Sequence, residues 1–273
     1  MIKRRYEMRK VLMPLLLAGT VLLPACSSVP ITGRSRLNFI PDSEMFAMSY
    51  SQYDDFLQNH EISDDEEAAR MVQRVGTRIK DSVQRYFRQQ GREEYLDGYE
   101  WEFNLIESED VNAWAMPGGK VVVYEGILPV TKTETGLAVV MGHEVAHAVA
   151  QHGSERMSQV LLAQLGGMAL SEALESKPEQ TRNLWMSAYG LGAQVGVILP
   201  FSRTHESEAD HMGLIFMAMA GYDPRESVDF WRRMADKGGP SPPEFLSTHP
   251  ADDTRIRNLE ELIPEAMKYY EAR

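Results

Sequence analysis

Two histidines and a glutamate in the middle of the chain have the spacing of a metal-binding motif. His143 and His147 are four residues apart, Glu144 follows the first histidine, and the surrounding apolar residues recur with helical periodicity. Positions four apart on a helix project from the same face, so both imidazoles can reach one metal ion. Imidazole nitrogen suits zinc, and a glutamate beside the first histidine lies close to metal-bound water. The motif predicts a zinc site, because these polar groups would otherwise be costly to bury in an apolar helix.

Two histidines do not complete such a site, because a catalytic zinc takes three protein ligands. Further along the chain, Glu206 and Asp210 are four residues apart and share a helix face, whereas Glu208 lies about 200° round the helix from Glu206. Either face could point at the metal, and His205 and His211 compete by residue type alone. We favour Glu206 as the third ligand, with Asp210 holding the far side of an imidazole ring.

Four ordered motifs give the chain a resemblance to a known family. It resembles the zinc metallopeptidases of the CAAX prenyl endopeptidase family, gluzincins that include HtpX-type membrane proteases and a branch of bacterial envelope lipoproteins. The resemblance covers about residues 35–270, and the matching segments are Asn112-Ala113 with Pro117-Gly118-Gly119, HEVAH at 143–147, SRTHESEAD at 202–210, and Thr248-His249-Pro250. It implies one zinc per chain with Glu206 as the third ligand. The absence of convincing internal membrane spans favours the lipoprotein branch.

The reaction implied by this resemblance is hydrolysis of peptide bonds. Zinc lowers the pKa of bound water from about 15.7 towards 7 and polarises the scissile carbonyl. Glu144 is expected to take the water proton and deliver it to the leaving amine. A developing oxyanion needs a further hydrogen-bond donor, for which His249 is the candidate because Pro250 fixes the following turn.

The remaining histidines, and a second possible role of His249, complete the assignment. His249 could instead bind the metal as a fourth ligand and hold the enzyme latent, or lie in a surface loop. His152 matches a further histidine of the family, but nine positions from His143 place it off the metal-facing side of a helix, so we expect a structural role. The others, which we expect not to bind the metal, are His60, His205 and His211.

A small sheet and many helices are expected to position these residues. Apolar alternation and β-branched runs predict strands over 99–107, 112–116 and 120–124, with Trp101, Phe103 and Leu105 on one face of the first. The strand at 120–124, beside Gly118-Gly119, is expected to offer a sheet edge that an extended peptide can join. Helical periodicity and start signals, including a capping box formed by Ser63 and Glu66, predict helices over 41–60, 63–91, 134–153, 155–175, 180–198, 204–220, 224–237 and 252–271.

This order of elements predicts one α+β domain over residues 41–273. The family resemblance implies that it is a zincin-like metallopeptidase domain. The stretch 183–202 carries no charge and is long enough to span a bilayer. Its amide and hydroxyl side chains and three glycines instead favour a buried or membrane-surface helix.

The first 25 residues have the features of a secretory signal peptide. Five basic residues among the first ten precede an apolar run over 11–23, which is too short to span a bilayer comfortably, although an uncleaved anchor is the alternative. The exit Leu23-Pro24-Ala25-Cys26 resembles the bacterial lipobox, which implies cleavage before Cys26 and lipidation of its thiol. Residues 26–40 are then a lipidated, irregular segment leading into the domain. Ser27 stands where aspartate would suggest inner-membrane retention, so we expect an outer-membrane lipoprotein facing the periplasm of a Gram-negative bacterium.

The net charge and the expected mode of peptide binding restrict the candidate partners. The 273 residues carry 28 basic against 40 acidic side chains, a net charge of −12, which disfavours nucleic acid as a partner. Backbone pairing at a sheet edge tolerates many sequences, so we expect a protease that degrades misfolded or stalled envelope proteins, with outer-membrane assembly machinery as a further candidate partner. The alternative is a chaperone-like or assembly-factor lipoprotein that uses the metallopeptidase fold mainly for binding.

Overall fold

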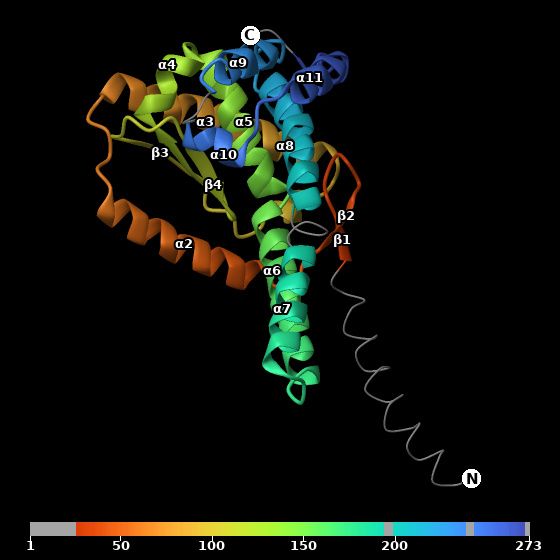
Figure 1. Ribbon diagram of the computed structural model, residues 1–273. Coiled ribbons are helices and arrows are strands. Elements are labelled where there is room, and N and C mark those ends of the chain that lie inside the picture. Colours follow the sequence, from red (N-terminus) through yellow and green to blue (C-terminus); the bar gives the residue numbers. More distant parts are fainter. Residues whose placement is uncertain (1–25, 194–198, 239–242, 271–273) are drawn as a thin grey trace.

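The computed structural model describes residues 26–193, 199–238 and 243–270. A three-stranded sheet lies between helices (Figure 1), with strands β3 (Glu102–Ile106), β4 (Ala113–Met116) and β5 (Lys120–Tyr124) in the order β3-β5-β4. Strand β3 is parallel to β5, and β4 is antiparallel to it. Together with the mostly helical remainder, this confirms the α+β expectation.

The two faces of the sheet are covered by different helices. Phe103, Leu105, Val121 and Val123 pack into the main core with α3 (Glu66–Gln89) and α5 (Glu134–Val149), and Trp101 packs against the same core, as its alternation with Phe103 predicts. The other face forms a smaller cluster in which Tyr53 of α2 (Asp42–Asn59) contacts Ile106 and Val122. Alternation along each strand therefore separates two apolar layers.

The prediction that the strand at 120–124 lies at the edge of the sheet is wrong. Strand β5 lies in the centre of the sheet, paired on both sides, because residues 120–123 are all buried and the run is apolar on both faces. Within the described part of the chain, β4 is paired only with β5 and is therefore an edge. The sheet still has an edge strand near the motif helix, but it is β4.

The remaining helices follow the expected order with several shifted bounds. Residue Gln151 adopts a left-handed conformation, with φ of 57°, and this breaks the helix expected over 134–153. Helix α3 is capped by Asp65, whose side chain accepts from the Glu67 and Ala68 amides, whereas Ser63 bonds Glu125 instead of forming the expected capping box. The short α10 (Glu244–Thr248) has no counterpart among the predicted helices. The other elements are η2 (Glu93–Leu96), η3 (Glu125–Ile127), α4 (Leu128–Thr131), α6 (His152–Ala173), α7 (Glu179–Ala193), α8 (Leu199–Met219), α9 (Glu226–Ala235), α10 (Glu244–Thr248) and α11 (Asp253–Ala266).

Helices α5 and α8 approach closely at two glycines. A Cβ atom on Gly142 would lie 3.1 Å from the Gly213 carbonyl oxygen, and one on Gly213 would lie 3.0 Å from backbone atoms of Gly142 and His143. Larger residues at either position would push the helices apart. Because His143 follows Gly142 and Asp210 lies one turn before Gly213, this contact brings the two predicted metal-binding segments together.

Residues 26–37 form a short hairpin instead of the irregular segment expected. Strands β1 (Cys26–Ser28) and β2 (Ser35–Leu37) pair antiparallel, with Cys26 opposite Leu37. We call residues 26–37 the N-terminal hairpin. It is docked on the domain, because Val29 is buried and Arg36 donates hydrogen bonds to the Ala150 carbonyl and the Tyr95 hydroxyl.

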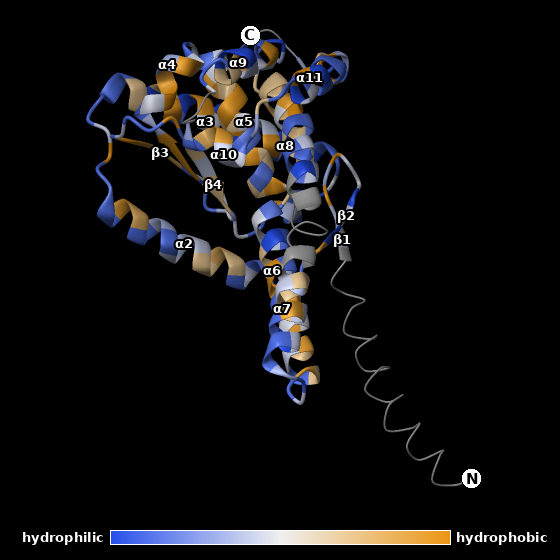
Figure 2. Ribbon diagram, viewed as in Figure 1, coloured by the Kyte–Doolittle hydropathy of each residue, from blue (hydrophilic) through white to orange (hydrophobic). Residues whose placement is uncertain are grey.

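Helices α6 and α7 form a hairpin that projects from the body (Figure 1), and Figure 2 shows apolar residues along it. Among the residues that the structure describes, no helix is both long and apolar enough to cross a bilayer. Leu184 and Trp185 are 70% and 56% exposed, so the buried alternative for the uncharged stretch is wrong at these positions. Part of that stretch, residues 194–198, lies outside the described residues, and a membrane-surface role stays a prediction.

Candidate metal centre

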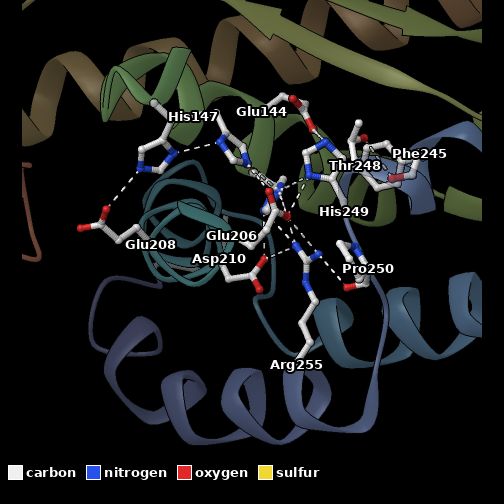
Figure 3. A network of polar contacts seen from close by, with 12 residues as sticks. Glu144, His147, Glu206, Glu208, Asp210, Phe245, Thr248, His249, Pro250 and Arg255 are labelled. Carbon is white, nitrogen blue, oxygen red and sulfur yellow. Dashed lines mark hydrogen bonds and ion pairs between the residues drawn. The ribbon is translucent and has the colours of Figure 1, made fainter. Parts of the chain in front are cut away.

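Four side chains from three parts of the chain bring their donor atoms together. His143 and His147 lie on α5, Glu206 lies on α8, and His249 follows α10; one atom of each lies within 4.8 Å of the others. The His143 Nε2 atom is 3.1 Å from His147 Nε2 and 3.1 Å from His249 Nδ1. The Glu206 carboxylate is 3.3 Å from both α5 histidines. Figure 3 shows Glu206 and His249 pointing toward one another from these separate elements.

The donor set fits a zinc ion. Three facing imidazole nitrogens and one carboxylate cannot satisfy one another by hydrogen bonding alone, since neutral imidazole offers one N–H and one lone pair. A cation among them would be bound by the lone pairs of all four groups. Nitrogen and carboxylate oxygen in this combination are ordinary zinc ligands.

Glu144 lies beside this cluster and is buried, with 3% of its surface exposed. Among the described residues, its Oε1 atom accepts no hydrogen bond, and His249 Nε2 lies 3.4 Å away. Burial raises the pKa of Glu144 to about 8, although the charge of His143 acts in the opposite direction. A carboxyl with a raised pKa and a free oxygen suits proton transfer near neutral pH.

Asp210 holds the outer nitrogen of His143. Its Oδ1 atom is 2.9 Å from His143 Nδ1, as its predicted position one turn from Glu206 requires. If Nε2 binds a metal, Nδ1 carries the proton and donates it to this carboxylate, which fixes the ring. Arg255 of α11 was not predicted from the sequence. It donates hydrogen bonds to Asp210 Oδ1 at 2.7 Å and to Glu206 Oε2 at 3.2 Å. Its guanidinium lies 3.4 Å from the centre of the Trp231 ring.

Neighbouring positive charges and hydrogen-bond donors keep both acids ionised. Burial acts to raise the pKa of Asp210, and the guanidinium beside it reverses this and lowers it. Burial likewise opposes ionisation of Glu206, yet the adjacent His147 and a hydrogen bond from His143 lower its pKa far below its usual range. Both acids are therefore carboxylates at neutral pH. No spacing signal marks Arg255, because only folding brings α11 to this site.

The other histidines and Glu208 lie outside the donor cluster. Glu208 faces away from it, as the helix geometry predicts, and its Oε2 atom lies 3.3 Å from His152 Nε2. His152 is not among the four donors, but its Nδ1 atom is 2.9 Å from Nδ1 of His147. Contacts of the other three histidines include His60 Nδ1 with the Phe56 carbonyl, His205 Nε2 with Glu155, and His211 Nε2 with Glu265.

A cavity of about 330 Å³ opens onto the site. Its lining includes Asn112 and residues 113–115 of the edge strand β4, together with Glu144, His147, Glu206 and His249. The Ala115 backbone also hydrogen-bonds the Glu144 carboxyl. An extended chain lying along β4 would therefore pass directly over the cluster.

The docking of the N-terminal hairpin should weaken in acid through Glu155. Burial acts to raise its pKa, but hydrogen bonds from Arg34 and His205 dominate and lower it from 4.5 to about 2. Because the folded value lies below the unfolded one, this stabilisation is complete above about pH 4.5 and is lost as the pH falls towards 2. We expect urea unfolding of the zinc-free protein between pH 6 and 3 to lose less stability in Glu155→Gln than in wild type. Equal losses in the two proteins would contradict this assignment.

The α+β fold, the His-Glu-x-x-His helix and the glutamate supplied by a second helix define a zinc metallopeptidase. The sequence model described as "Peptidase family M48" matches residues 69–263, and the chain belongs to this family.

Three relatives illustrate the similarity. The chain is 35% identical over 184 residues to mitochondrial metalloendopeptidase OMA1 of Saccharomyces cerevisiae, which covers 64% of this chain and 51% of the relative. It is 32% identical over 253 residues to OMA1 of Bos taurus, and the aligned region covers 89% of this chain and 47% of the relative. It is 34% identical over 159 residues to the beta-barrel assembly-enhancing protease of Yersinia pestis, and the aligned region covers 56% of this chain and 32% of the relative. The chain thus spans about half the length of the first two relatives. The sequence resemblance named CAAX prenyl endopeptidases and HtpX-type enzymes, whereas these relatives are OMA1 enzymes and a beta-barrel assembly-enhancing protease.

Proposed function

We propose that this protein is a zinc-dependent endopeptidase, anchored as a lipoprotein, that degrades misfolded or stalled proteins of the cell envelope. The observation that carries the proposal is the convergence of His143, His147 and Glu206 beside the buried Glu144. Zinc, when bound there, supplies an activated water and a Lewis acid for the scissile carbonyl. Glu144 then accepts the water proton on its free oxygen and returns it to the leaving amine. Asp210 and Arg255 keep His143 and Glu206 in position.

The substrate class follows from the edge strand. Strand β4 borders the cavity, and β5 is the one strand paired with it in the described part of the chain, so a peptide can add to its other edge by main-chain hydrogen bonds. Such pairing requires an extended substrate and reads little of its sequence. Unfolded or misassembled proteins meet that requirement, whereas compact native domains do not.

The test of this function is cleavage of one protein in two states. We expect the zinc-loaded protein to cut a reduced, permanently unfolded protein and to leave its native, disulfide-bonded form intact. A zinc chelator should stop cleavage, and added zinc should restore it. Binding of the unfolded form without any cleavage by the zinc-loaded protein would support the assembly-factor alternative and contradict the proposal.

The proposed location rests on the lipobox-like sequence before Cys26 and on the name of the Yersinia relative, a beta-barrel assembly-enhancing protease. The OMA1 relatives are mitochondrial, so the family itself does not specify a compartment. Attachment to the periplasmic face of the outer membrane would bring the enzyme close to stalled envelope proteins and to the machinery that assembles them.

Cys26→Ser should abolish lipidation. Expressed in a Gram-negative host, wild type is expected to incorporate labelled palmitate and to fractionate with the outer membrane, because the thiol is the acylation site. The serine variant should remain an unlipidated precursor or leave the outer-membrane fraction. Equal palmitate labelling of the two proteins would show that Cys26 is not the site.

A further inference from the structure

The N-terminal hairpin inserts one arginine between two buried acids. Arg34 makes two parallel hydrogen bonds to Glu155, at 2.8 and 2.7 Å, and donates from Nε to Glu208 Oε2 at 2.7 Å. Thr32 of the same turn donates its hydroxyl to the other Glu208 oxygen. Glu155 and Glu208 are only 1% and 6% exposed, so their charges need this compensation.

A continuous series of contacts leads from Arg34 to the metal centre. Glu208 Oε2 lies 3.3 Å from His152 Nε2, and His152 Nδ1 lies 2.9 Å from His147 Nδ1. The opposite nitrogen of His147, Nε2, is the one in the donor cluster. Two side chains, Glu208 and His152, therefore connect Arg34 of the hairpin to His147.

The protons in this series can be arranged in only one direction when His147 binds a metal through Nε2. The His147 Nδ1 atom then carries the proton and donates it to the lone pair of His152 Nδ1. His152 must then carry its own proton on Nε2, which faces the Glu208 carboxylate. Glu208 thus selects the tautomer of His152, and His152 in turn fixes the ring of His147.

The two α5 histidines are supported in the same way from opposite ends of the chain. Behind His143, the acid is Asp210 and its cation is Arg255 of α11. Behind His147, the acid is Glu208, reached through His152, and its cation is Arg34 of the N-terminal hairpin. The second support is built by the segment that directly follows Cys26.

We infer that Arg34 is a positioning residue for the metal ligand His147, acting through Glu208 and His152. The N-terminal hairpin is then part of the metal centre, and its docking is required for tight zinc binding. This inference rests on the zinc site of the proposed function. It adds one requirement for zinc binding, the docking of the N-terminal hairpin, which the four donor residues alone do not impose.

The test is the rate at which the purified full chain releases zinc to an excess of a colorimetric chelator. Loss of a group that orients a metal-bound histidine costs roughly 10- to 100-fold in metal affinity. We expect Arg34→Met and Glu208→Gln each to release zinc at least about tenfold faster than wild type, and Arg34→Lys to lie between, because lysine cannot reach both acids with a planar fork. The double variant Arg34→Met/Glu208→Gln should release zinc no faster than the quicker single variant, since both act through His152.

One control variant and one alternative test variant separate positioning from a general loss of stability. Arg70 is an exposed arginine of α3 that pairs with the exposed Glu66 of the same helix, so Arg70→Met should release zinc at the wild-type rate. Glu208→Gln keeps the shape of the side chain and tests the same series if Arg34→Met does not fold. Release within twofold of wild type in both Arg34→Met and Glu208→Gln, or effects that multiply in the double variant, would overturn the inference. A wild-type chain that holds no zinc would instead contradict the proposed function and remove the basis of the inference.

Discussion

Replacing Glu144 with glutamine is expected to lower the rate of peptide hydrolysis about a thousandfold or more while leaving zinc bound. Glutamine has nearly the same shape but cannot accept the water proton, and general-base catalysis contributes about 10²- to 10⁴-fold. The residue is not a donor in the four-atom cluster, so metal binding should persist. The comparison is kcat/KM on an unfolded protein or a quenched peptide, with zinc content measured on the same samples.

The matched control for this prediction is Glu66→Gln. Glu66 is an exposed glutamate at the start of α3, paired with Arg70 and far from the metal-binding helix in the chain. Its replacement should leave kcat/KM unchanged. A Glu144→Gln protein that retains zinc and cleaves within about tenfold of wild type would show that another group takes the proton.

His249→Ala is expected to raise activity by about tenfold, the increase that follows if the open form is about a tenth of the population. The His249 Nδ1 atom lies 2.8 Å from Glu206 Oε2 and 3.1 Å from His143 Nε2, inside the donor cluster. Burial lowers the pKa of His249 to about 4, so the ring is neutral at pH 7 and its lone pair is available to a metal. A fourth protein ligand fills the position that a catalytic zinc keeps for water. Steady-state cleavage by the purified variant, with zinc content checked, measures the effect.

The opposite outcome would assign His249 another role. If His249 stabilises the oxyanion, its removal should lower kcat about a hundredfold with zinc retained and KM little changed. That result would contradict the latching role. Kinetics indistinguishable from wild type would exclude both roles, even though the structure places the ring at the site.

The core of the site could be predicted because it depends on local periodicity. His143 and His147 share a helix face by spacing alone, and the same geometry separates Glu206 and Asp210 from Glu208. Helix α5 needed only its apolar pattern to be recognised. The structure brings His143, His147 and Glu206 together, and it also places at the site His249, which precedes Pro250.

The supporting residues could not be predicted because they depend on tertiary contacts. Arg34 and Arg255 come from opposite ends of the chain, and nothing in their local sequence points to a carboxylate partner. His152 was expected to be structural and not a metal ligand, but its contact with His147 was not predicted, because the left-handed Gln151 starts a new helix and brings the two rings together.

Strand order shows a similar limit. The strand at 120–124 was recognised, but its central position depends on pairing with a parallel β3 and an antiparallel β4. Its run of three valines was the available signal, since a strand buried on both faces is apolar throughout. The two strands of the N-terminal hairpin were not predicted, because its polar, glycine-containing sequence is also typical of an irregular linker.

The most direct test of the zinc site is metal analysis of purified wild type beside His147→Ala. One zinc per chain is predicted for wild type, because His143, His147 and Glu206 complete the three-ligand set of a catalytic site. The alanine variant should lose most of its zinc after dialysis against a weak chelator, while circular dichroism shows that its helices persist. Full zinc occupancy in His147→Ala, or none in wild type, would contradict the assignment of this cluster as the metal centre.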